Sequence, residues 1–211
     1  MSRTRIKICG LTREADVDDA IDAGADALGF VLYEKSSRYV SVERAAELIA
    51  RLPPFITPVL LFVNTSPALL RRASEALPQA LLQFHGDETP EQCQAPGHPY
   101  LRAARMVPGL DLLDFAAHFA SAQGLLLDAH VDAYGGGGKV FDWSLIPPSV
   151  PLPVVLSGGL SPANVTDGVL RVRPWAVDVS SGVESAKGVK NAALIRRFCK
   201  AVREADASLA N

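Results

Sequence analysis

The chain has 211 residues, a formal net charge of −2, 48% hydrophobic residues and 21% charged residues. This is the balance of an ordinary globular protein, and it excludes extensive disorder. Nucleic acid or an anionic membrane surface as the main partner would require a concentrated basic face, so we expect neither. Any anionic substrate must therefore be bound by local features of the chain.

The cysteine pattern and the N-terminus indicate where the protein works. The cysteines Cys9, Cys93 and Cys199 are widely spaced and form no CxxC pair. A zinc site or a disulfide framework is therefore not expected, and a reducing compartment is favoured. The N-terminus has no long apolar run, and the apolar run at residues 59–63 is far too short to span a bilayer. We therefore expect a cytoplasmic protein.

In chain order, short apolar runs alternate with longer amphipathic ones. The short runs have the length and composition of strands and lie near residues 5–9, 27–32, 57–63, 80–85, 100–106, 124–128, 153–157 and 176–180. Helical spacing of small and apolar residues recurs between them, as in Ala45, Leu48, Ile49 and Leu52. After the sixth run, only a short helix near residues 143–146 is expected.

Three helix starts are predicted from capping residues. Ser66 and Ser161 each precede a proline, which suits a capping hydroxyl followed by the first helical position. Thr89 has a glutamine three residues later, the pattern of a capping box.

Eight strand–helix units in a chain of this length predict a single (β/α)8 barrel, a TIM barrel, formed by residues 1–211. A doubly wound open sheet is the main alternative, but it usually has fewer units. The last residues, 207–211, are expected to fray.

Side chains alternate between the two faces of a strand, so each strand predicts an inward and an outward set. One set is apolar and suits the helix-facing side. The other set is polar and comes near the C-terminal strand ends, where barrel enzymes have their active sites: Lys7, Cys9, Gln83, His85, Asp128, Asp178 and Ser180. Burying these groups costs free energy unless they meet partners or a ligand, so we favour a functional site over a purely structural polar network.

Two glycine-rich segments predict a phosphate site. Gly158 and Gly159 follow the seventh strand, and Ser180, Ser181 and Gly182 follow the eighth. Backbone N–H groups of glycines can approach an anion closely, and serine hydroxyls add donors. A short extra helix after the eighth strand would direct its positive end to the same place. These two loops are the usual phosphate site of this fold.

A second glycine run, at residues 135–138 before Lys139, follows the sixth strand. It is either a flexible surface loop or a loop that covers the substrate, and its closeness in sequence to Asp128 favours the second interpretation.

The chain also resembles a known family, the phosphoribosylanthranilate isomerases. The motifs that carry the resemblance occur in order over nearly the whole chain: Lys7-Ile8-Cys9-Gly10-Leu11-Thr12, Gly24-Ala25-Asp26-Ala27-Leu28-Gly29-Phe30, Ser36-Ser37-Arg38-Tyr39, Phe62-Val63-Asn64, Gln83-Phe84-His85-Gly86, Leu127-Asp128, residues 135–143, Leu156-Ser157-Gly158-Gly159-Leu160 and residues 177–184. The departures are small. Gly137 stands where the family often has Thr or Ser, and Phe84 where it often has Leu. The glycine at position 137 puts in doubt one contact that a hydroxyl group of this loop would make.

The resemblance implies an Amadori rearrangement of N-(5-phosphoribosyl)anthranilate to 1-(2-carboxyphenylamino)-1-deoxyribulose 5-phosphate, a step of tryptophan biosynthesis. By the family's pattern Cys9 is the general base, Asp128 the general acid and Arg38 the clamp on the anthranilate carboxylate. No metal or cofactor is implied, because the nitrogen of the substrate is the electron sink.

The chemistry sets conditions on the two proton-transfer groups. Cys9 needs a modest fall in pKa, for which Lys7 is a plausible cause, and Asp128 must carry a proton when it acts. His85 is either a substrate-side residue or a core histidine, and Asp178 is better explained as the partner of Lys7 than as a catalytic group. Cys93 and Cys199 lie in helical patterns and are expected to be structural.

Other functions remain as alternatives. A sister isomerase of histidine biosynthesis would resemble a pattern with aspartate in place of Cys9, and a metal-dependent epimerase would need more inward histidines than His85. A flavin-binding barrel would use the same phosphate loops. A non-catalytic phosphosugar-binding module would have little reason to combine Cys9, Asp128 and Arg38.

The sequence leaves oligomeric state open, with a monomer as the default, and leaves room for transient contact with neighbouring pathway enzymes.

Overall fold

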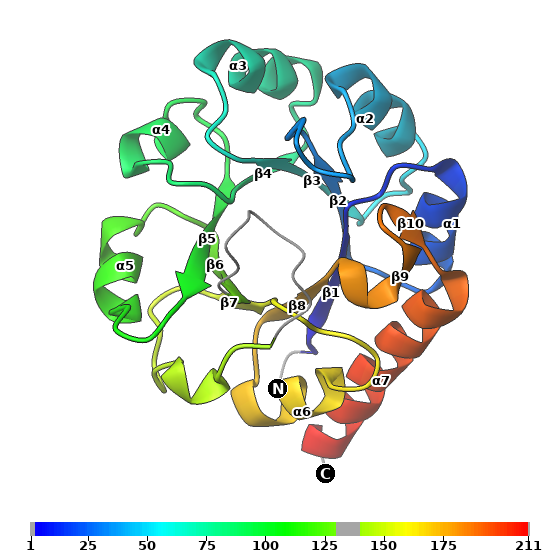
Figure 1. Ribbon diagram of the computed structural model, residues 1–211, viewed down its shortest axis with the longest axis vertical. Coiled ribbons are helices and arrows are strands. Elements are labelled where there is room, and N and C mark those ends of the chain that lie inside the picture. The colour runs from blue at the N-terminus through cyan, green and yellow to red at the C-terminus, as the bar shows by residue number, and fades with distance from the viewer. Residues whose placement is uncertain (1–2, 130–139, 211) are drawn as a thin grey trace.

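The computed structural model describes residues 3–129 and 140–210, which form a closed barrel of eight parallel strands in the order β1 to β8. The strands are β1 (Arg5–Cys9), β2 (Ala27–Val31), β3 (Thr57–Phe62), β4 (Leu81–Phe84), β5 (Tyr100–Met106), β6 (Gly124–Ala129), β7 (Val154–Leu156) and β8 (Ala176–Val179). Figure 1 shows them around a central axis with the helices as an outer ring. The predicted (β/α)8 barrel is confirmed, and every strand bound agrees within two residues.

The outer ring contains α1 (Glu14–Asp22), α2 (Val42–Ile49), α3 (Pro67–Ala76), α4 (Pro90–Gln94), α5 (Leu112–His118), α6 (Val165–Val172) and α7 (Ala192–Ala210). Two of the predicted caps are confirmed. The Ser66 side chain accepts from Leu69 N, and Thr89 forms a full capping box with Gln92. The third is wrong, because α6 begins at Val165, and the turn that Ser161 opens accounts for the intervening residues.

Single 3-10 turns follow two of the barrel strands, in place of a regular helix after β6 and ahead of α7 after β8. A single 3-10 turn, η1 (Trp143–Leu145), follows β6, as expected. After β8 comes another single 3-10 turn, η2 (Ser181–Val183), and then a hairpin of β9 (Glu184–Ala186) and β10 (Val189–Lys190) that the sequence reasoning missed. Thr12 Oγ1 donates to Gly188 O at 3.1 Å, so the hairpin lies against the segment that joins β1 to α1 (Figure 1).

The core has two layers, as the strand alternation predicted. The residues between barrel and helices are apolar and include Ile6, Ile8, Leu82, Phe84 and Val177. A smaller apolar cluster of Leu101, Ala103, Leu126, Val155 and Ala176 lies inside the barrel toward the N-terminal ends of the strands. Toward the C-terminal ends of the strands, the predicted polar residues lie beside a small apolar cluster of Cys9, Val31, Leu61 and Val63.

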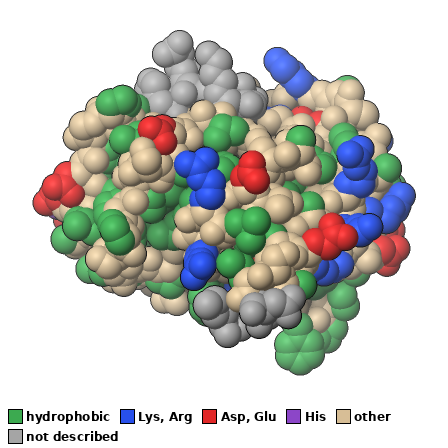
Figure 2. Space-filling model, turned by 90° about the horizontal axis from the view of Figure 1, so that it is seen from below, with side chains coloured by type: hydrophobic (Ala, Val, Ile, Leu, Met, Phe, Trp, Pro, Cys, Tyr) green, Lys and Arg blue, Asp and Glu red, His purple; other side chains and the backbone are tan. Residues whose placement is uncertain are grey.

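The surface is held together partly by ion pairs between neighbouring helices. Arg51 pairs with Asp18 of α1, and Arg72 of α3 pairs with Glu43 of α2. Figure 2 shows basic and acidic side chains interspersed on one face of the molecule. Exposed pairs of this kind contribute little each, roughly 0–1 kcal/mol. No helix among the described residues is long and apolar enough to cross a membrane.

Candidate active site

The predicted polar ring begins with a buried ion pair between adjacent strands. The register of β1 and β8 pairs Lys7 with Asp178, and Lys7 Nζ donates to Asp178 Oδ1 at 2.8 Å. Ser157 Oγ donates to the other oxygen of Asp178 at 3.3 Å. Burial alone would lower the pKa of Lys7. The charges of Asp178 and Cys9 outweigh this effect and raise the pKa above its ordinary value, so Lys7 stays protonated. Asp178 thus has the partner expected for it.

Cys9 lies beside Lys7 at the upper end of β1. A Cβ atom placed on Gly29 of the neighbouring β2 would be 2.7 Å from Cys9 Sγ and 3.1 Å from Lys7 Nζ, so this glycine leaves the room that both side chains occupy. Burial raises the pKa of the Cys9 thiol, and the charge of Lys7 only partly opposes this. The expected net fall in pKa is therefore wrong for the free protein, because desolvation outweighs the neighbouring ammonium.

Across the barrel mouth, β4 and β6 bring three more predicted residues into one chain of hydrogen bonds. Gln83 Nε2 lies 3.0 Å from His85 Nδ1, and His85 Nε2 lies 2.9 Å from Asp128 Oδ2. With the Gln83 amide donating to Nδ1, the proton of a neutral His85 ring lies on Nε2 and is donated to Asp128. The other oxygen of Asp128 accepts from Ala129 N at 2.9 Å. The imidazole therefore fixes the direction of the Asp128 carboxylate.

The end of β4 is supported by a buried arginine that sequence reasoning did not single out. Arg102 of β5 donates to Phe84 O at 2.9 Å and to Gly86 O at 3.0 Å, the carbonyls on either side of His85. Its guanidinium also lies over the Phe119 ring at 4.8 Å. Arg102 therefore holds the backbone that carries His85, although a charged residue inside a strand gives no signal of such a role.

The two predicted phosphate loops lie against one another. A Cβ atom on Gly182 would overlap the carbonyl oxygen of Leu160, so the loop after β8 packs directly on the loop after β7. Gly158 and Gly159 have φ of +78° and +68°, a conformation that L side chains rarely adopt. The extra element after β8 is the turn η2 alone, so the expected extra helix is reduced to one 3-10 turn. Ser180 and Ser181 are both partly exposed beside these glycines.

Arg38 follows β2 and reaches the same side of the mouth as Cys9. A Cβ atom on Gly10 would overlap Arg38 Cδ and come within 3.1 Å of Ser180 Oγ. The Arg38 guanidinium donates to both oxygens of Glu184, at 2.6 and 2.8 Å. This bidentate bond raises the pKa of Arg38 further. Glu184 had no role assigned from sequence, although it closes the last of the family motifs.

The glycine run at residues 135–138 and Lys139, expected to cover the substrate, lie outside the described residues. Cys93 and Cys199 are buried in α4 and α7, and burial raises the pKa of Cys93 to about 12 and that of Cys199 to about 11. Both thiols lie in the helix layer, and they are buried there.

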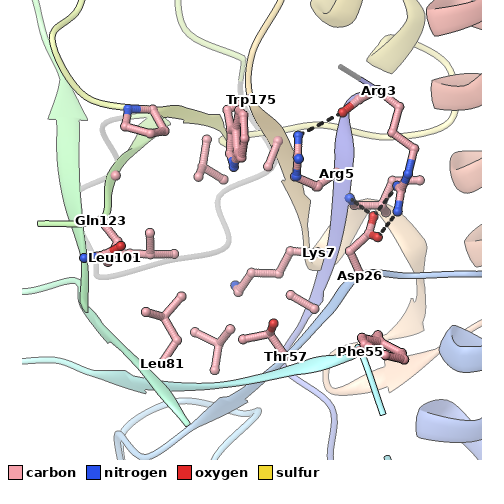
Figure 3. Close-up of a pocket in the computed structure, with 17 residues that line it drawn as sticks. Arg3, Arg5, Lys7, Asp26, Phe55, Thr57, Leu81, Leu101, Gln123 and Trp175 are labelled. Atoms are coloured by element: carbon pink, nitrogen blue, oxygen red, sulfur yellow. Dashed lines mark hydrogen bonds and ion pairs between the residues drawn. The ribbon is translucent and has the colours of Figure 1, made fainter. Parts of the chain in front are cut away.

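A cavity of about 510 Å³ lies at the opposite, N-terminal end of the barrel. Figure 3 shows its lining, with Arg5 stacked on Trp175, the ion pair of Arg3 with Asp26, and Lys7 pointing into the interior. Apart from Lys7, none of the predicted site residues lines it. The cavity is therefore separate from the predicted catalytic groups, which lie at the C-terminal strand ends as the fold requires.

Comparisons with known proteins agree along the chain. The sequence model of a family described as N-(5'-phosphoribosyl)anthranilate (PRA) isomerase matches residues 6–201. The chain is 72% identical over 206 residues to the N-(5'-phosphoribosyl)anthranilate isomerase of Leptothrix cholodnii, covering 98% of this chain and 94% of that one. It is 72% identical over 208 residues to that of Methylibium petroleiphilum, covering 99% and 98%.

Solved structures give the same result. The phosphoribosyl anthranilate isomerase of Thermotoga maritima superposes with a TM-score of 0.88 at 40% identity, covering 95% of this chain and 99% of that one. A phosphoribosyl anthranilate isomerase in complex with reduced 1-(o-carboxyphenylamino)-1-deoxyribulose 5-phosphate superposes with a TM-score of 0.84 at 37% identity, covering 95% and 99%.

Proposed function

The chain belongs to the N-(5'-phosphoribosyl)anthranilate isomerase family, and we propose that Cys9 and Asp128 carry out the two proton transfers of its reaction. The protein is an isomerase that converts N-(5-phosphoribosyl)anthranilate to 1-(2-carboxyphenylamino)-1-deoxyribulose 5-phosphate, by an acid–base Amadori rearrangement in tryptophan biosynthesis. Opening of the furanose ring requires a general acid, and removal of the C2 proton requires a general base.

In the first step, Asp128 donates a proton to the furanose ring oxygen. The bond between that oxygen and C1 breaks, and the nitrogen lone pair forms the C1=N bond of an iminium ion. The hydrogen bond from His85 supports the position of Asp128 in this role, because it fixes the direction of the carboxyl group at the mouth. Both Asp128 oxygens accept hydrogen bonds in the free protein, so the proton that Asp128 donates must be taken up when the substrate binds. Gln83 holds the imidazole in turn.

In the second step, Cys9 removes the C2 proton, which the iminium ion has made acidic, and the electron pair moves to nitrogen to give an enolamine. Tautomerisation to the ketone completes the isomerisation. The base must be a thiolate, whereas burial raises the pKa of Cys9 in the free protein. The positive charge of the iminium ion and the ammonium of Lys7 both favour the thiolate when it is needed. The proposed mechanism thus requires a proton on Asp128 and none on Cys9.

Binding is assigned to the residues around this pair. Arg38 binds the anthranilate carboxylate, and the phosphate is held by Gly158, Gly159, Ser180, Ser181 and Gly182. Lys7, Gln83, His85 and Asp178 complete the substrate-facing wall. Glycines at positive φ whose N–H groups face an anion suit the phosphate role. The remaining expectations belong to this proposal as well: one catalytic domain over residues 1–211, no metal or cofactor, a cytoplasmic location and transient contact with neighbouring pathway enzymes.

The observation that carries the acid–base assignment is the meeting of Cys9 with Lys7 on one side of the mouth and of Asp128 with His85 on the other. Freshly made phosphoribosylanthranilate loses its anthranilate-type fluorescence on turnover, so kcat can be followed directly. We expect Cys9→Ala and Asp128→Asn each to reduce kcat by about 10²–10⁴-fold. Cys199→Ala, which removes a buried thiol far from the mouth, is the matched control. Near wild-type turnover in Cys9→Ala or Asp128→Asn would refute the corresponding assignment.

A further inference from the structure

Three charged side chains meet at the edge of the barrel mouth, and two of them come from the β9–β10 hairpin. Lys190 Nζ donates to Glu184 Oε1 at 2.8 Å, and the same carboxylate accepts both bonds from Arg38. The Lys190 side chain is 0% exposed and the Glu184 side chain 6%. Two cations therefore share one buried carboxylate.

Lys190 also contacts the loop predicted to bind phosphate. Its ammonium donates to Ser180 O at 3.0 Å and to Ser180 Oγ at 3.3 Å. Its backbone N–H donates to Asp16 of α1 at 3.3 Å, and Arg13 donates to its carbonyl at 3.3 Å. Lys190 thus joins α1, the loop after β8 and the Glu184–Arg38 pair, which fixes its position closely.

The charges of the described side chains around Cys9 do not balance. The cations that act on this thiol come from three elements, and they are Lys7, Arg38 and Lys190. Two carboxylates pair with them, Asp178 with Lys7 and Glu184 with the other two cations. The Arg13–Asp16 pair below the hairpin is neutral as a unit. One positive charge is left over.

A surplus charge inside a protein is costly unless an anion can approach it. Burial lowers the pKa of Lys190, and the Glu184 carboxylate opposes that fall. Burial raises the pKa of Cys9 most, Lys7 opposes this, and Lys190 lowers the pKa by a smaller amount. The surplus charge therefore favours a thiolate at Cys9.

We propose that Lys190 is a positioning residue of the isomerase: it fixes Glu184 against Arg38, and it supplies the surplus positive charge that a thiolate at Cys9 neutralises. The inference rests on the proposed roles of Arg38 and Cys9. Lys190 acts through these two residues and needs no contact with the reacting atoms.

The test uses charge changes of opposite sign in one cluster. Lys190→Met removes a cation, Glu184→Gln removes an anion, and Lys190→Arg keeps the charge. Lys187→Met is the matched control, because Lys187 lies exposed in the same hairpin. Two quantities are measured for each variant: the pH midpoint of iodoacetamide alkylation at Cys9, located by mass spectrometry, and KM and kcat for phosphoribosylanthranilate. Thermal melting confirms folding.

We expect Lys190→Met to raise the alkylation midpoint of Cys9 by about one pH unit and Glu184→Gln to lower it, because the two substitutions change the local charge in opposite directions. Both should raise KM by about tenfold, because each loosens Arg38. Lys190→Arg should return the midpoint to near its wild-type value, and Lys187→Met should change neither quantity.

A midpoint in Lys190→Met equal to that in Lys187→Met would overturn the inference, as would shifts of the same sign in Lys190→Met and Glu184→Gln, which a purely structural role would produce. If Lys190→Met does not fold, the inference is tested by the other two variants. The alkylation midpoint of Cys9 must then fall in Glu184→Gln and stay near its wild-type value in Lys190→Arg. Alkylation is independent of turnover. A failure of Cys9 as the catalytic base would appear in the activity of Cys9→Ala and would leave the alkylation result interpretable.

Discussion

The two ends of the barrel interior differ in what fills them. At the C-terminal end, polar side chains from β1, β4, β6 and β8 bond to one another, as Lys7 does to Asp178 and His85 to Asp128. At the N-terminal end, apolar residues of the inner cluster and the Arg5–Trp175 stack surround an open cavity of about 510 Å³. The cavity at the N-terminal end thus lies away from the residues proposed for the chemistry, apart from Lys7.

The difference follows from the direction of parallel strands. Every strand ends at the same side of the barrel, so eight loops and eight strand ends can bring polar groups together there. At the other end the strands begin, and their first inward residues, such as Ala27, Leu81 and Leu101, pack or line the cavity. Substitutions matched in chemistry at the two ends should therefore separate activity from stability.

Among the substitutions that compare the two ends of the barrel, the largest effect is expected for Gly158→Ala. At a φ of +78° the alanine is strained, and its Cβ would overlap Ala129 N and come within 3.0 Å of Asp128 Oδ1. We expect kcat/KM to fall by more than about tenfold, because the end of β6 that carries Asp128 must move. Gly97→Ala is the matched control at the other end, since Gly97 has a φ of +68° and its Cβ would meet nothing within 4 Å.

Both alanine variants should lose about 1–3 kcal/mol of the free energy of unfolding to backbone strain, measured by chemical denaturation. Equal losses of kcat/KM in the two variants would contradict the proposed separation of the two ends.

An intermediate effect is expected on stability at high pH. Burial raises the pKa of Cys93 to about 12 and of Cys199 to about 11, above the ordinary thiol value of about 8.5 in the unfolded chain. The unfolded state therefore loses thiol protons first as pH rises. The stability due to these thiols is fully present below about pH 8.5. It declines from there to about pH 11 for Cys199 and about pH 12 for Cys93, by at most about 1.4 kcal/mol per pH unit and thiol.

Cys199→Ala should make the fall in the free energy of unfolding shallower over this range, as measured by urea denaturation at a series of pH values. An unchanged slope would mean that the Cys199 thiol titrates alike in the folded and unfolded states.

The smallest effect on activity is expected at the N-terminal end. Trp175→Ala removes the ring on which Arg5 stacks at 3.5 Å. We expect a loss of about 1 kcal/mol in the free energy of unfolding and no change in kcat/KM beyond about twofold. A large loss of turnover with preserved folding would show that the two ends of the barrel are coupled.

Much of the fold and of the candidate site could be predicted because the signals are local. Apolar and polar residues alternate with a period of two along Lys7, Ile8 and Cys9, and this alternation assigns each side chain to the interior or to the helix layer. Asp178 was expected to balance Lys7, and the register of β1 and β8 places them together. Strand bounds were accurate because a buried parallel strand is a short apolar run between polar segments.

Other features gave no such signal. The β9–β10 hairpin has strands of three and two residues, too short for a period to be recognised, and the glycine turn between them was not interpreted. The helix start at Ser161 was misplaced because a turn can use the same serine and proline that begin a helix. Arg102 lies within a strand pattern, and its contacts with Phe84 O and Gly86 O depend on the neighbouring strand.

By itself, the sequence determined the eight units of the barrel, the residues that face its interior and the end at which the polar residues proposed for the chemistry meet. These depend on periodicity and on strand direction, which are properties of short segments. The tertiary structure decided the state and partners of those residues: a Cys9 thiol whose pKa burial raises, an Arg38 already bound to Glu184, and a Lys190 brought to the same carboxylate by a hairpin. Desolvation and ion pairing depend on which distant segments meet in space, and no local pattern specifies that.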